Sequence, residues 1–365
     1  MRRIRSSTCS RCFAAAALAS AMRRIEADTA MIPASASIAR LHGPGDLRFE
    51  DEALPAAPGT GEILARTLWS TISPGTELAA FQGLPPLRPG RVYPRLVGYC
   101  NVAEILAIGV GVERLVPGMR VLTWQSHRSA FIVPVADVLA ILPPDADARA
   151  ASAAYLFHLG LDAVHRTGIS LGHRVAVLGM GVLGLGAAAM AARAGADVSA
   201  ITARPEIAGI ARAMGACAVV GPDEAVAAAQ ATDVGGFDNV VSTSNRWPDW
   251  ELALRLARKG GTVSVLGFPG RGEPPSPSNP LASQYFYDKQ LRLVACGQPV
   301  ERDAPPDEIR FTLKRNMADI VGRIARGDLP AGRLLTGEYP AASLADAYRA
   351  LAARRPGDVT SVLAW

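Results

Sequence analysis

The glycine run Gly179-Met-Gly-Val-Leu-Gly184 constrains the fold of this chain more than any other feature of the sequence. It follows directly on the apolar segment 174–178 and opens a stretch rich in alanine. In this spacing the first glycine permits a tight turn, the second lets the backbone approach a pyrophosphate, and the third lets a helix pack closely on a strand. The free amides at the start of that helix favour a bound phosphate. The run therefore predicts a strand–turn–helix unit that binds a dinucleotide through Gly179, Gly181, Val182, Leu183 and Gly184.

The segments after this motif alternate between apolar runs and helical stretches. We expect strands at 197–201, 217–220, 238–242 and 261–266, and helices at 205–215, 223–231 and 248–258. Alternation of this kind specifies βαβ units and a doubly wound parallel sheet. Residues 151–300 are therefore predicted to form an α/β domain of the Rossmann type. We also assign Ser242, Thr243, Gly267 and Phe268 to its cofactor site.

The remaining residues have a different character, and 365 residues exceed the usual size of one domain. Residues 36–150 contain short β-like runs that glycine and proline separate, at 62–68, 102–108, 120–124 and 130–135. This pattern predicts a barrel-like β domain, followed by a helical stretch at 148–167. Residues 301–365 are expected to return to this first domain, with one long helix, a short helix at 343–353 and a last strand at 359–363.

The end of the second Rossmann strand indicates which cofactor is bound. An NAD site expects an acidic residue there, about 20 residues after the motif, to bind the ribose 2′-hydroxyl. Here the strand ends Ile201-Thr-Ala-Arg204, without a carboxylate. Thr202 and Arg204 can instead bind a 2′-phosphate through charge-assisted hydrogen bonds. We therefore expect NADP; the alternative is that Arg204 only faces solvent.

From about residue 38 to its end, the chain resembles the medium-chain dehydrogenase/reductase superfamily. The resemblance rests on the order of the β-rich and Rossmann parts and on the runs at 177–185, 213–216 and 258–267. It implies a GroES-like β-barrel catalytic domain, a Rossmann NADP-binding domain and a substrate cleft between them. It also implies a homodimer, with 291–296 as an edge-pairing strand.

The residues that bind zinc in the zinc-dependent members of this superfamily are replaced. Those members carry a cysteine in the stretch that matches 71–78, where this chain has Ser73 and Pro74. They carry Gly-His-Glu where this chain has Gly98-Tyr99-Cys100, and the four-cysteine structural lobe is absent. A catalytic zinc needs three protein ligands, so we expect no bound metal. The chain most resembles the zinc-less branch related to the bacteriochlorophyllide dehydrogenases.

Without zinc, the chemistry requires another group to stabilise the substrate oxygen. A nicotinamide supplies the hydride, and a carbonyl that is reduced needs a hydrogen-bond donor or a proton at its oxygen. The candidates are Tyr99, Ser73, Thr76 and His127, each with a structural hydrogen bond in a turn as the alternative role. Glu77 is expected to be a structural partner, and His158 and His165 to be packing or surface residues.

Three functions remain open from the sequence. The first is a zinc-independent, NADP(H)-dependent oxidoreductase that interconverts an alcohol and a carbonyl. The second is an NADPH-dependent reductase of the C=C bond of an enone or quinone. The third is an NADP-binding protein without turnover. In each case the expected ligand besides the cofactor is a small molecule, and the sequence does not identify the substrate.

The charge of the chain, +5 at neutral pH, does not indicate nucleic-acid binding. Residues 1–35 carry six arginines and two acids, which leaves the rest nearly neutral and without a basic stripe. This leader reads either as a weak signal peptide or as the result of a start placed too far upstream, with Met22 or Met31 as the true start; we favour the second. The scattered cysteines and the lack of a credible membrane span predict a cytoplasmic protein.

Overall fold

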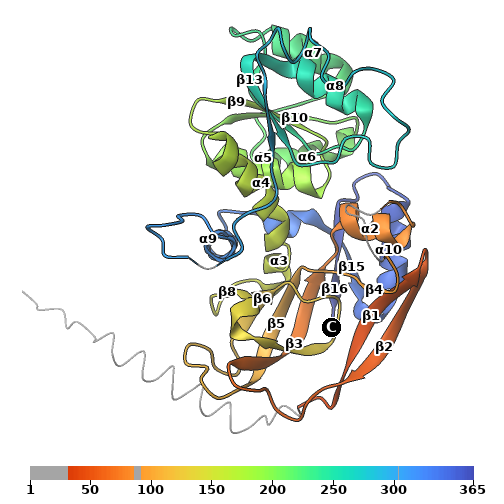
Figure 1. The fold of residues 1–365 in the computed structure, drawn as a ribbon, viewed down its shortest axis with the longest axis vertical. Coiled ribbons are helices and arrows are strands. Elements are labelled where there is room, and N and C mark those ends of the chain that lie inside the picture. The colour runs from red at the N-terminus through yellow and green to blue at the C-terminus, as the bar shows by residue number, and fades with distance from the viewer. Residues whose placement is uncertain (1–31, 86–91, 303) are drawn as a thin grey trace, which may run out of the picture.

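The computed structural model describes residues 32–85, 92–302 and 304–365. Residues 1–31, which include Cys9 and Cys12, therefore lie outside the described residues. In Figure 1 a parallel sheet with its helices forms the upper part, and a β-rich part that contains the C-terminus forms the lower part. The predicted α/β class, with a β-barrel part and a Rossmann part, is confirmed.

The β-rich part consists of two sheets. The smaller has the order β2-β1-β4 and the larger β15-β16-β3-β5-β6-β8, with β7 paired to β3. The bounds are β1 Ser35–Gly43, β2 Asp46–Ala53, β3 Glu62–Thr71, β4 Arg95–Leu96, β5 Asn101–Ile108, β6 Arg120–Thr123, β7 Ala130–Pro134, β8 Val138–Ile141, β15 Leu335–Pro340 and β16 Thr360–Ala364. The five strands predicted here all form. The β1–β2 hairpin was not predicted, because β2 is largely exposed and charged and so lacks an apolar alternation.

The upper part is a six-stranded sheet of order β11-β10-β9-β12-β13-β14, in which every pair is parallel. Its strands are β9 Arg174–Leu178, β10 Asp197–Ile201, β11 Ala218–Val220, β12 Phe237–Ser242, β13 Ala257–Val265 and β14 Arg292–Ala295. The helices of the two parts together are α2 Pro74–Phe81, α3 Ala148–Ala151, α4 Ala154–Thr167, α5 Val182–Arg193, α6 Ala208–Ala213, α7 Pro222–Gln230, α8 Trp247–Leu256, α9 Leu313–Ala325 and α10 Leu344–Ala352. The helix predicted at 205–215 is shorter, because residues 205–207 form a 3-10 turn that begins with proline.

The helix predicted at 148–167 is two helices. Asp147 caps α3 by accepting hydrogen bonds from the amides of Arg149 and Ala150. Ser152, between α3 and α4, shares a 2.6 Å hydrogen bond with Thr71 at the end of β3. The start of α4 is therefore tied to the β-rich part.

Two glycines let α4 pack very closely on α5. A Cβ atom at Gly160 would lie 2.6 Å from the Cα atom of Ala187, and one at Gly186 would lie 2.9 Å from the carbonyl oxygen of Leu156. Neither distance is compatible with a side chain, so glycine is required at both positions. The second contact explains the glycine that follows the dinucleotide motif by two positions.

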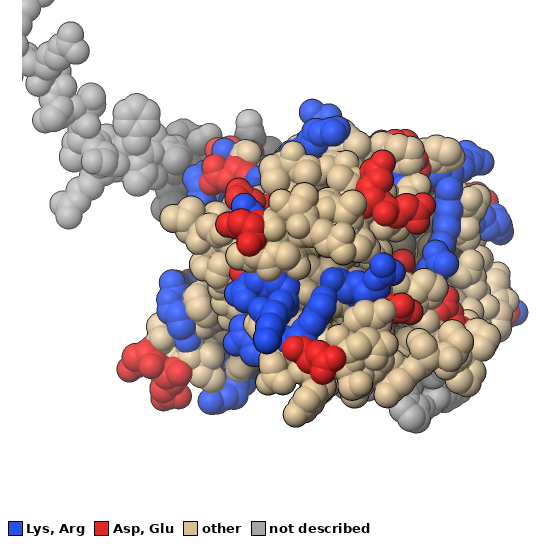
Figure 2. Space-filling view, turned by 90° about the horizontal axis from the view of Figure 1, so that it is seen from above, with Lys and Arg blue, Asp and Glu red and all other residues tan. Residues whose placement is uncertain are grey.

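The surface has a mixed distribution of charge. Figure 2 shows a short band of Lys and Arg side chains across one face, with Asp and Glu side chains on both sides of it. Within the described residues, no helix is both long and apolar enough to cross a membrane.

Candidate active site

The turn from β3 to α2 positions the first two candidate hydroxyl groups. Ser73 is the N-cap residue of α2 and is buried, and Pro74 begins the helix with its φ angle already suited to it. The Ser73 side chain does not cap the helix. Its backbone amide instead donates a 2.6 Å hydrogen bond to the Glu77 carboxylate. The Ser73 hydroxyl is therefore free to contact other groups, and Thr76 lies one turn further along α2.

Tyr99 reaches this pair of hydroxyls from the segment before β5. Its phenol donates to the Ser73 hydroxyl at 2.5 Å and lies 3.4 Å from the Thr76 hydroxyl. Burial is the main cause that raises the pKa of Tyr99 well above its usual value, so the phenol stays protonated at neutral pH. We call Ser73, Thr76 and Tyr99 the hydroxyl cluster. Three of the four predicted catalytic residues therefore meet.

The fourth candidate, His127, lies beside this cluster but is fully buried. Its Nε2 atom is 2.8 Å from Glu77 Oε2, and its Nδ1 atom is 2.8 Å from the Ser70 hydroxyl. Gly98 covers the ring, because a Cβ atom there would lie 2.7 Å from it and the φ angle is +86°. The imidazole is thus enclosed by its structural partners.

Both nitrogen atoms of the His127 ring have a hydrogen-bond partner. Trp365 Nε1 donates to the Ser70 hydroxyl at 2.8 Å. Ser70 can then give its own proton to Nδ1 of His127, and Nε2 donates to Glu77. Because a carboxylate oxygen can only accept, Nε2 of His127 carries the proton of the bond to Glu77, and each nitrogen of the ring has a partner.

Four residues of this region could not be found by sequence reasoning. Tyr348 donates to Glu77 at 2.6 Å, and Trp365 and Ser70 complete the group described above. Tyr155, on α4, places its ring edge-on to Tyr99 with 5.5 Å between ring centroids. Burial raises its pKa to about 12. No local pattern marks these residues, since their partners are up to 295 positions away in the sequence.

Cys100, where the zinc-dependent enzymes carry glutamate, is fully buried behind Tyr99. Burial, and then the nearby charge of Glu77, raise the pKa of the Cys100 thiol well above its usual value. The thiol is therefore neutral and inert as a ligand or nucleophile. Within residues 32–85, 92–302 and 304–365, no three His, Cys, Asp or Glu side chains are grouped so that they could hold a metal ion. The residues present do not fit a catalytic zinc.

The glycine run forms a cradle that suits a dinucleotide. Gly179 has a φ angle of +90°, and a Cβ atom at Gly184 would lie 1.7 Å from the Gly179 carbonyl oxygen, so both must be glycine. Gly181 is the N-cap of α5, and the space where its side chain would stand is empty. A pyrophosphate can therefore approach the backbone there. Val182 and Leu183 form the first turn of α5.

The other predicted cofactor residues line the same edge of the sheet. Thr243 Oγ1 is 2.9 Å from the carbonyl oxygens of Leu178 and Gly179 and so holds the loop. The hydroxyl of Ser242, at the end of β12, is buried without a hydrogen-bond partner among the described residues. An unpaired buried hydroxyl is costly, and a bound cofactor would relieve that cost. Gly267 must lack a side chain, because a Cβ atom would lie 2.3 Å from the Ser244 carbonyl oxygen, and Phe268 beside it is exposed.

Thr202 and Arg204 follow β10, as predicted, but the guanidinium of Arg204 already has partners. It is 3.2 Å from the carboxylate of Glu206 and donates to the backbone carbonyl of Asp358 at 2.7 Å. The hydroxyl of Thr202 accepts a hydrogen bond from the amide of Arg204. Arg204 thus contacts the segment before β16, a strand of the larger sheet in the β-rich part.

Arg271 brings a positive charge to the same region from the loop after β13. Its guanidinium lies 3.4 Å from the backbone carbonyls of Gly75 and Pro85, and Gly75 stands between Ser73 and Thr76. Among the described residues, the hydrogen bonds of its guanidinium all go to backbone carbonyls and none to an acidic side chain. Burial, and then the like charge of Arg95, lower its pKa. An anion at this position would neutralise a partly desolvated charge.

Comparisons with known proteins find relatives in sequence and in fold. The family model described as "Zinc-binding dehydrogenase" matches residues 182–309, which run from α5 to beyond β14 and exclude the hydroxyl cluster. L-galactonate-5-dehydrogenase of Escherichia coli is 27% identical over 341 residues, which cover 84% of this chain and 92% of that protein.

Two solved structures share the fold over nearly their whole length. 2R,3R-butanediol dehydrogenase from Bacillus subtilis has a TM-score of 0.75 at 18% identity and covers 91% of this chain and all of its own. A protein of Sinorhizobium meliloti described as a zinc-binding dehydrogenase and bound to NADP has a TM-score of 0.73 at 21% identity, with the same coverage. Residues 182–309 are thus similar to the zinc-binding dehydrogenases, and most of the chain shares the two-part fold of these dehydrogenase structures.

Proposed function

We propose that this chain is a zinc-independent, NADP(H)-dependent oxidoreductase that interconverts an alcohol and a carbonyl by hydride transfer. The observation that carries the proposal is the hydroxyl cluster, in which a protonated phenol and two hydroxyls meet, and no described residues near it form a metal-ligand set. The activity of the relatives, which are named as dehydrogenases of alcohols and sugar acids, supports the same reaction class.

The cofactor would be held by the glycine cradle, by the free amides at the start of α5 and by the unpaired hydroxyl of Ser242. It would supply the hydride for the substrate carbon. The NADP-bound relative supports a nicotinamide at this place. Preference for the 2′-phosphate rests on Thr202 and Arg204, which carry a hydroxyl and a cation where an NAD site has a carboxylate.

The hydroxyl cluster would act on the substrate oxygen. As a carbonyl is reduced, its oxygen becomes negative, and the Tyr99 phenol or the hydroxyl of Ser73 or Thr76 can donate a hydrogen bond and then a proton to it. Water can restore that proton after the alcohol leaves. The enclosed His127 and Glu77 would hold the start of α2 in place rather than touch the substrate, so they are positioning residues.

A substrate that carries a carboxylate next to several hydroxyl groups fits the surroundings of this cluster. Arg271 is a partly buried guanidinium within 3.4 Å of Gly75 and without an acidic partner among the described residues. The relative from E. coli is named for L-galactonate, which is a polyhydroxy carboxylate. We therefore include hydroxy acids in the proposed substrate class, with Arg271 as the carboxylate ligand.

The test is an oxidation assay at 340 nm with a panel of sugar acids, polyols and simple secondary alcohols, each with NADP+ and with NAD+. We expect turnover of at least one hydroxy acid with NADP+. In the reverse direction, product analysis separates the two chemistries: a secondary alcohol supports the proposal, and a saturated ketone from an enone supports C=C reduction. NADPH binding without turnover of any alcohol, carbonyl, enone or quinone would overturn the proposal.

Arg271→Gln tests the substrate class within the same assay. It should reduce kcat/KM for a hydroxy acid by about ten- to a hundredfold, because one charge-assisted hydrogen bond contributes about 1.5–3 kcal/mol. The value for a neutral polyol should change little. An equal loss for both would show that Arg271 does not bind a carboxylate.

Zinc independence has its own measurement. Chain purified without a histidine tag should contain far less than one zinc ion per molecule, and treatment with a chelator should leave its activity unchanged. One tightly held zinc ion per chain would contradict this part of the proposal.

We also propose a homodimer that forms through the edge strand β14, which has only β13 as a neighbour in the sheet. Light scattering should give twice the mass of one chain. The amide of Cys296 donates to Val265 on β13, so the amide of Ala295 faces the free edge. Ala295→Pro, which removes that donor, should shift the mass toward that of the monomer.

A further inference from the structure

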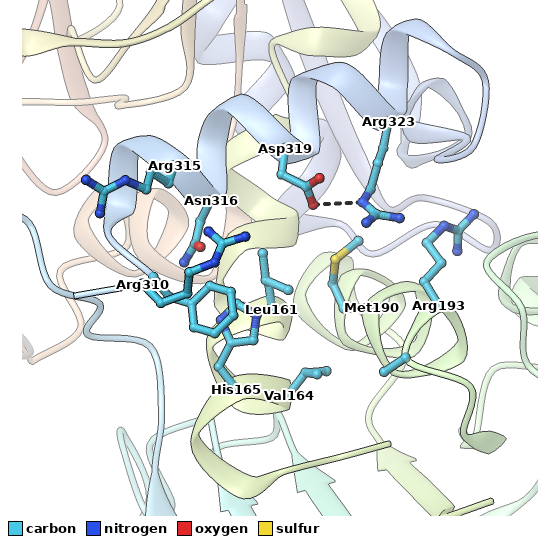
Figure 3. A pocket seen from close by; sticks show the side chains of 12 residues that line it. Leu161, Val164, His165, Met190, Arg193, Arg310, Arg315, Asn316, Asp319 and Arg323 are labelled. Atoms are coloured by element: carbon cyan, nitrogen blue, oxygen red, sulfur yellow. Dashed lines mark hydrogen bonds and ion pairs between the residues drawn. The ribbon is translucent and has the colours of Figure 1, made fainter. Parts of the chain in front are cut away.

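A pocket of about 320 Å³ lies outside the proposed active site, where α4, α5 and α9 meet. Figure 3 shows it from close by. We call it the α4–α9 pocket. It is lined by Leu161, Val164, His165, Met190, Arg193, Ala194, Arg310, Phe311, Arg315, Asn316, Asp319 and Arg323.

This pocket is remote from the cofactor cradle. It contacts α5 at Met190, Arg193 and Ala194, at the end opposite to the glycine run. A helix rises about 1.5 Å per residue, so roughly 16 Å separates the two ends of α5. A ligand in the pocket would therefore not occupy the dinucleotide site.

One side of the pocket is apolar. Leu161 and Val164 of α4 and Met190 of α5 form this surface, and Figure 3 shows their side chains together below α9. The rings of His165 and Phe311 stack with 3.7 Å between their centroids and extend it. Burial is the main cause that lowers the pKa of His165, so its ring is uncharged at neutral pH. The surface suits a hydrocarbon or aromatic group.

The rim of the pocket carries an excess of positive charge. Its lining includes four arginines and one acid, which leaves three formal positive charges without a lining carboxylate. Asp319 pairs with Arg323 at 2.8 Å. Arg193 donates to backbone carbonyls, among them those of Ala189 and Asp328, so its hydrogen bonds fix it in place without neutralising its charge.

The two remaining arginines also lack a carboxylate partner among the described residues. Arg315 donates to the backbone carbonyls of Ile309 and Ala304. The guanidinium of Arg310 lies over the Phe311 ring, 5.2 Å from its centroid. In Figure 3 Arg310 stands on one side of the pocket, Arg193 and Arg323 stand on the other, and Arg315 points away.

We propose that the α4–α9 pocket binds a small amphipathic organic anion. Its carboxylate or phosphate would contact Arg310 or Arg323 at the rim, and its apolar part would cover Leu161, Val164 and Met190. A volume of about 320 Å³ is at the lower end of the range of ligand pockets, so the occupant is small. A fully hydrated inorganic ion would leave the apolar surface unused, and a neutral hydrocarbon would leave the excess positive charge of the lining without an anion.

The test is calorimetric titration of the full chain, in the presence of saturating NADPH, with four probes. Octanoate and octyl phosphate carry both parts of the proposed ligand, whereas inorganic phosphate has only the charge and octanol only the chain. We expect one site per chain for octanoate or octyl phosphate, at least tenfold tighter than for the other two. The better of the two anions identifies the preferred headgroup. Octanol binding as tightly as the anions, or binding of the anions only when NADPH is left out, would overturn the proposal.

Variants locate the site. Arg310→Gln combined with Arg323→Gln should weaken octanoate binding at least tenfold. The control is Arg326→Gln, which removes an arginine of the same surface that pairs with Asp328 and does not line the pocket. Ala194→Phe should fill the pocket and abolish binding. Equal affinity in the double variant and in its control would place the octanoate elsewhere. Unchanged NADPH affinity and melting temperature verify that each variant is folded, independently of any catalytic activity.

Discussion

The Tyr348 hydroxyl donates a 2.6 Å hydrogen bond to the Glu77 carboxylate, although the two residues are 271 positions apart. The same carboxylate accepts from the Ser73 amide and from His127 Nε2. Glu77 is therefore a buried carboxylate with three donors, which is the condition under which burial of that charge is tolerated. Since Ser73 and Thr76 stand in the same turn of α2, this group holds the hydroxyl cluster in position.

Tyr348→Phe should destabilise the protein without abolishing cofactor binding. It removes one hydrogen bond to a buried charge, which costs about 1.5–3 kcal/mol, and the melting temperature should fall by several degrees. NADPH affinity should stay unchanged. The control is Tyr339→Phe, whose hydroxyl has no hydrogen bond to a described residue, and which should leave the melting temperature within about 1 °C. Equal melting temperatures of the two variants would show that the Tyr348–Glu77 contact contributes nothing.

Tyr99→Phe should lower kcat by about 10²-fold or more while NADPH affinity and melting temperature change little. The ring and its packing on Tyr155 remain, and only the donor at the hydroxyl cluster is lost. Tyr93→Phe is the matched control, because it removes a tyrosine hydroxyl that donates to the carbonyl of Ala80, away from the cluster.

Variants of neighbouring residues, measured in the same way, show whether Tyr99 or another residue holds the catalytic role. His127→Asn should lower the melting temperature by several degrees, because the enclosed ring positions α2, whereas kcat of the folded protein should fall much less than in Tyr99→Phe. A nearly fully active Tyr99→Phe beside a folded but inactive His127→Asn would transfer the catalytic role to His127. An inactive Tyr155→Phe would transfer it to the second phenol.

Arg204→Ala should weaken NADPH binding by about ten- to a hundredfold and leave NADH binding nearly unchanged. One charge-assisted hydrogen bond to the 2′-phosphate contributes about 1.5–3 kcal/mol. Glu206→Gln should act in the opposite direction and strengthen NADPH binding, because it removes the carboxylate that pairs with Arg204. Arg212→Ala, an exposed arginine on α6, is the control. Equal losses of NADPH and NADH in Arg204→Ala would show that the arginine does not recognise the 2′-phosphate. Fluorescence titration measures the NADPH and NADH affinities of the unaltered chain and of each variant.

His158 should make the protein sensitive to acid between about pH 6.5 and pH 4. Burial is the main cause that lowers its pKa to about 4, from 6.5 in an exposed histidine. Below pH 6.5 the His158 side chain of the unfolded protein takes up a proton, whereas that of the folded protein does not. The free energy of unfolding is therefore unaffected by His158 above pH 6.5 and falls as the pH decreases toward 4. The loss should be roughly 2–3 kcal/mol.

Denaturant unfolding at pH 7, 5.5 and 4.5 measures how steeply the free energy of unfolding falls with decreasing pH; we call this the pH slope. His158→Phe keeps an aromatic ring on Tyr155 and should flatten it, whereas His173→Phe, at the turn before β9, should not. An unchanged slope in His158→Phe would mean that other groups cause the acid sensitivity.

The sequence determined the elements whose signal is local. The glycine run, the apolar strand before it and the alanine-rich helix after it lie within about twenty residues, so their physical requirements are visible in the sequence order. The replacement of histidine and glutamate by Tyr99 and Cys100 is equally local, and it indicated missing metal ligands and the role of Tyr99. The stretch 71–78, where the ligand cysteine is absent, indicated the other two residues of the hydroxyl cluster, Ser73 and Thr76.

The tertiary structure alone decided which of these residues meet and which are enclosed. Tyr348, Trp365 and Ser70 surround Glu77 and His127 through contacts between distant segments, and no sequence period encodes such contacts. It also decided that Arg204 pairs with Glu206 and Asp358, and that arginines of α5, α9 and the segment before α9 surround one pocket. The physical reason is that hydrophobic patterning specifies which face of an element is buried, whereas the side chains that meet there depend on how separate elements pack.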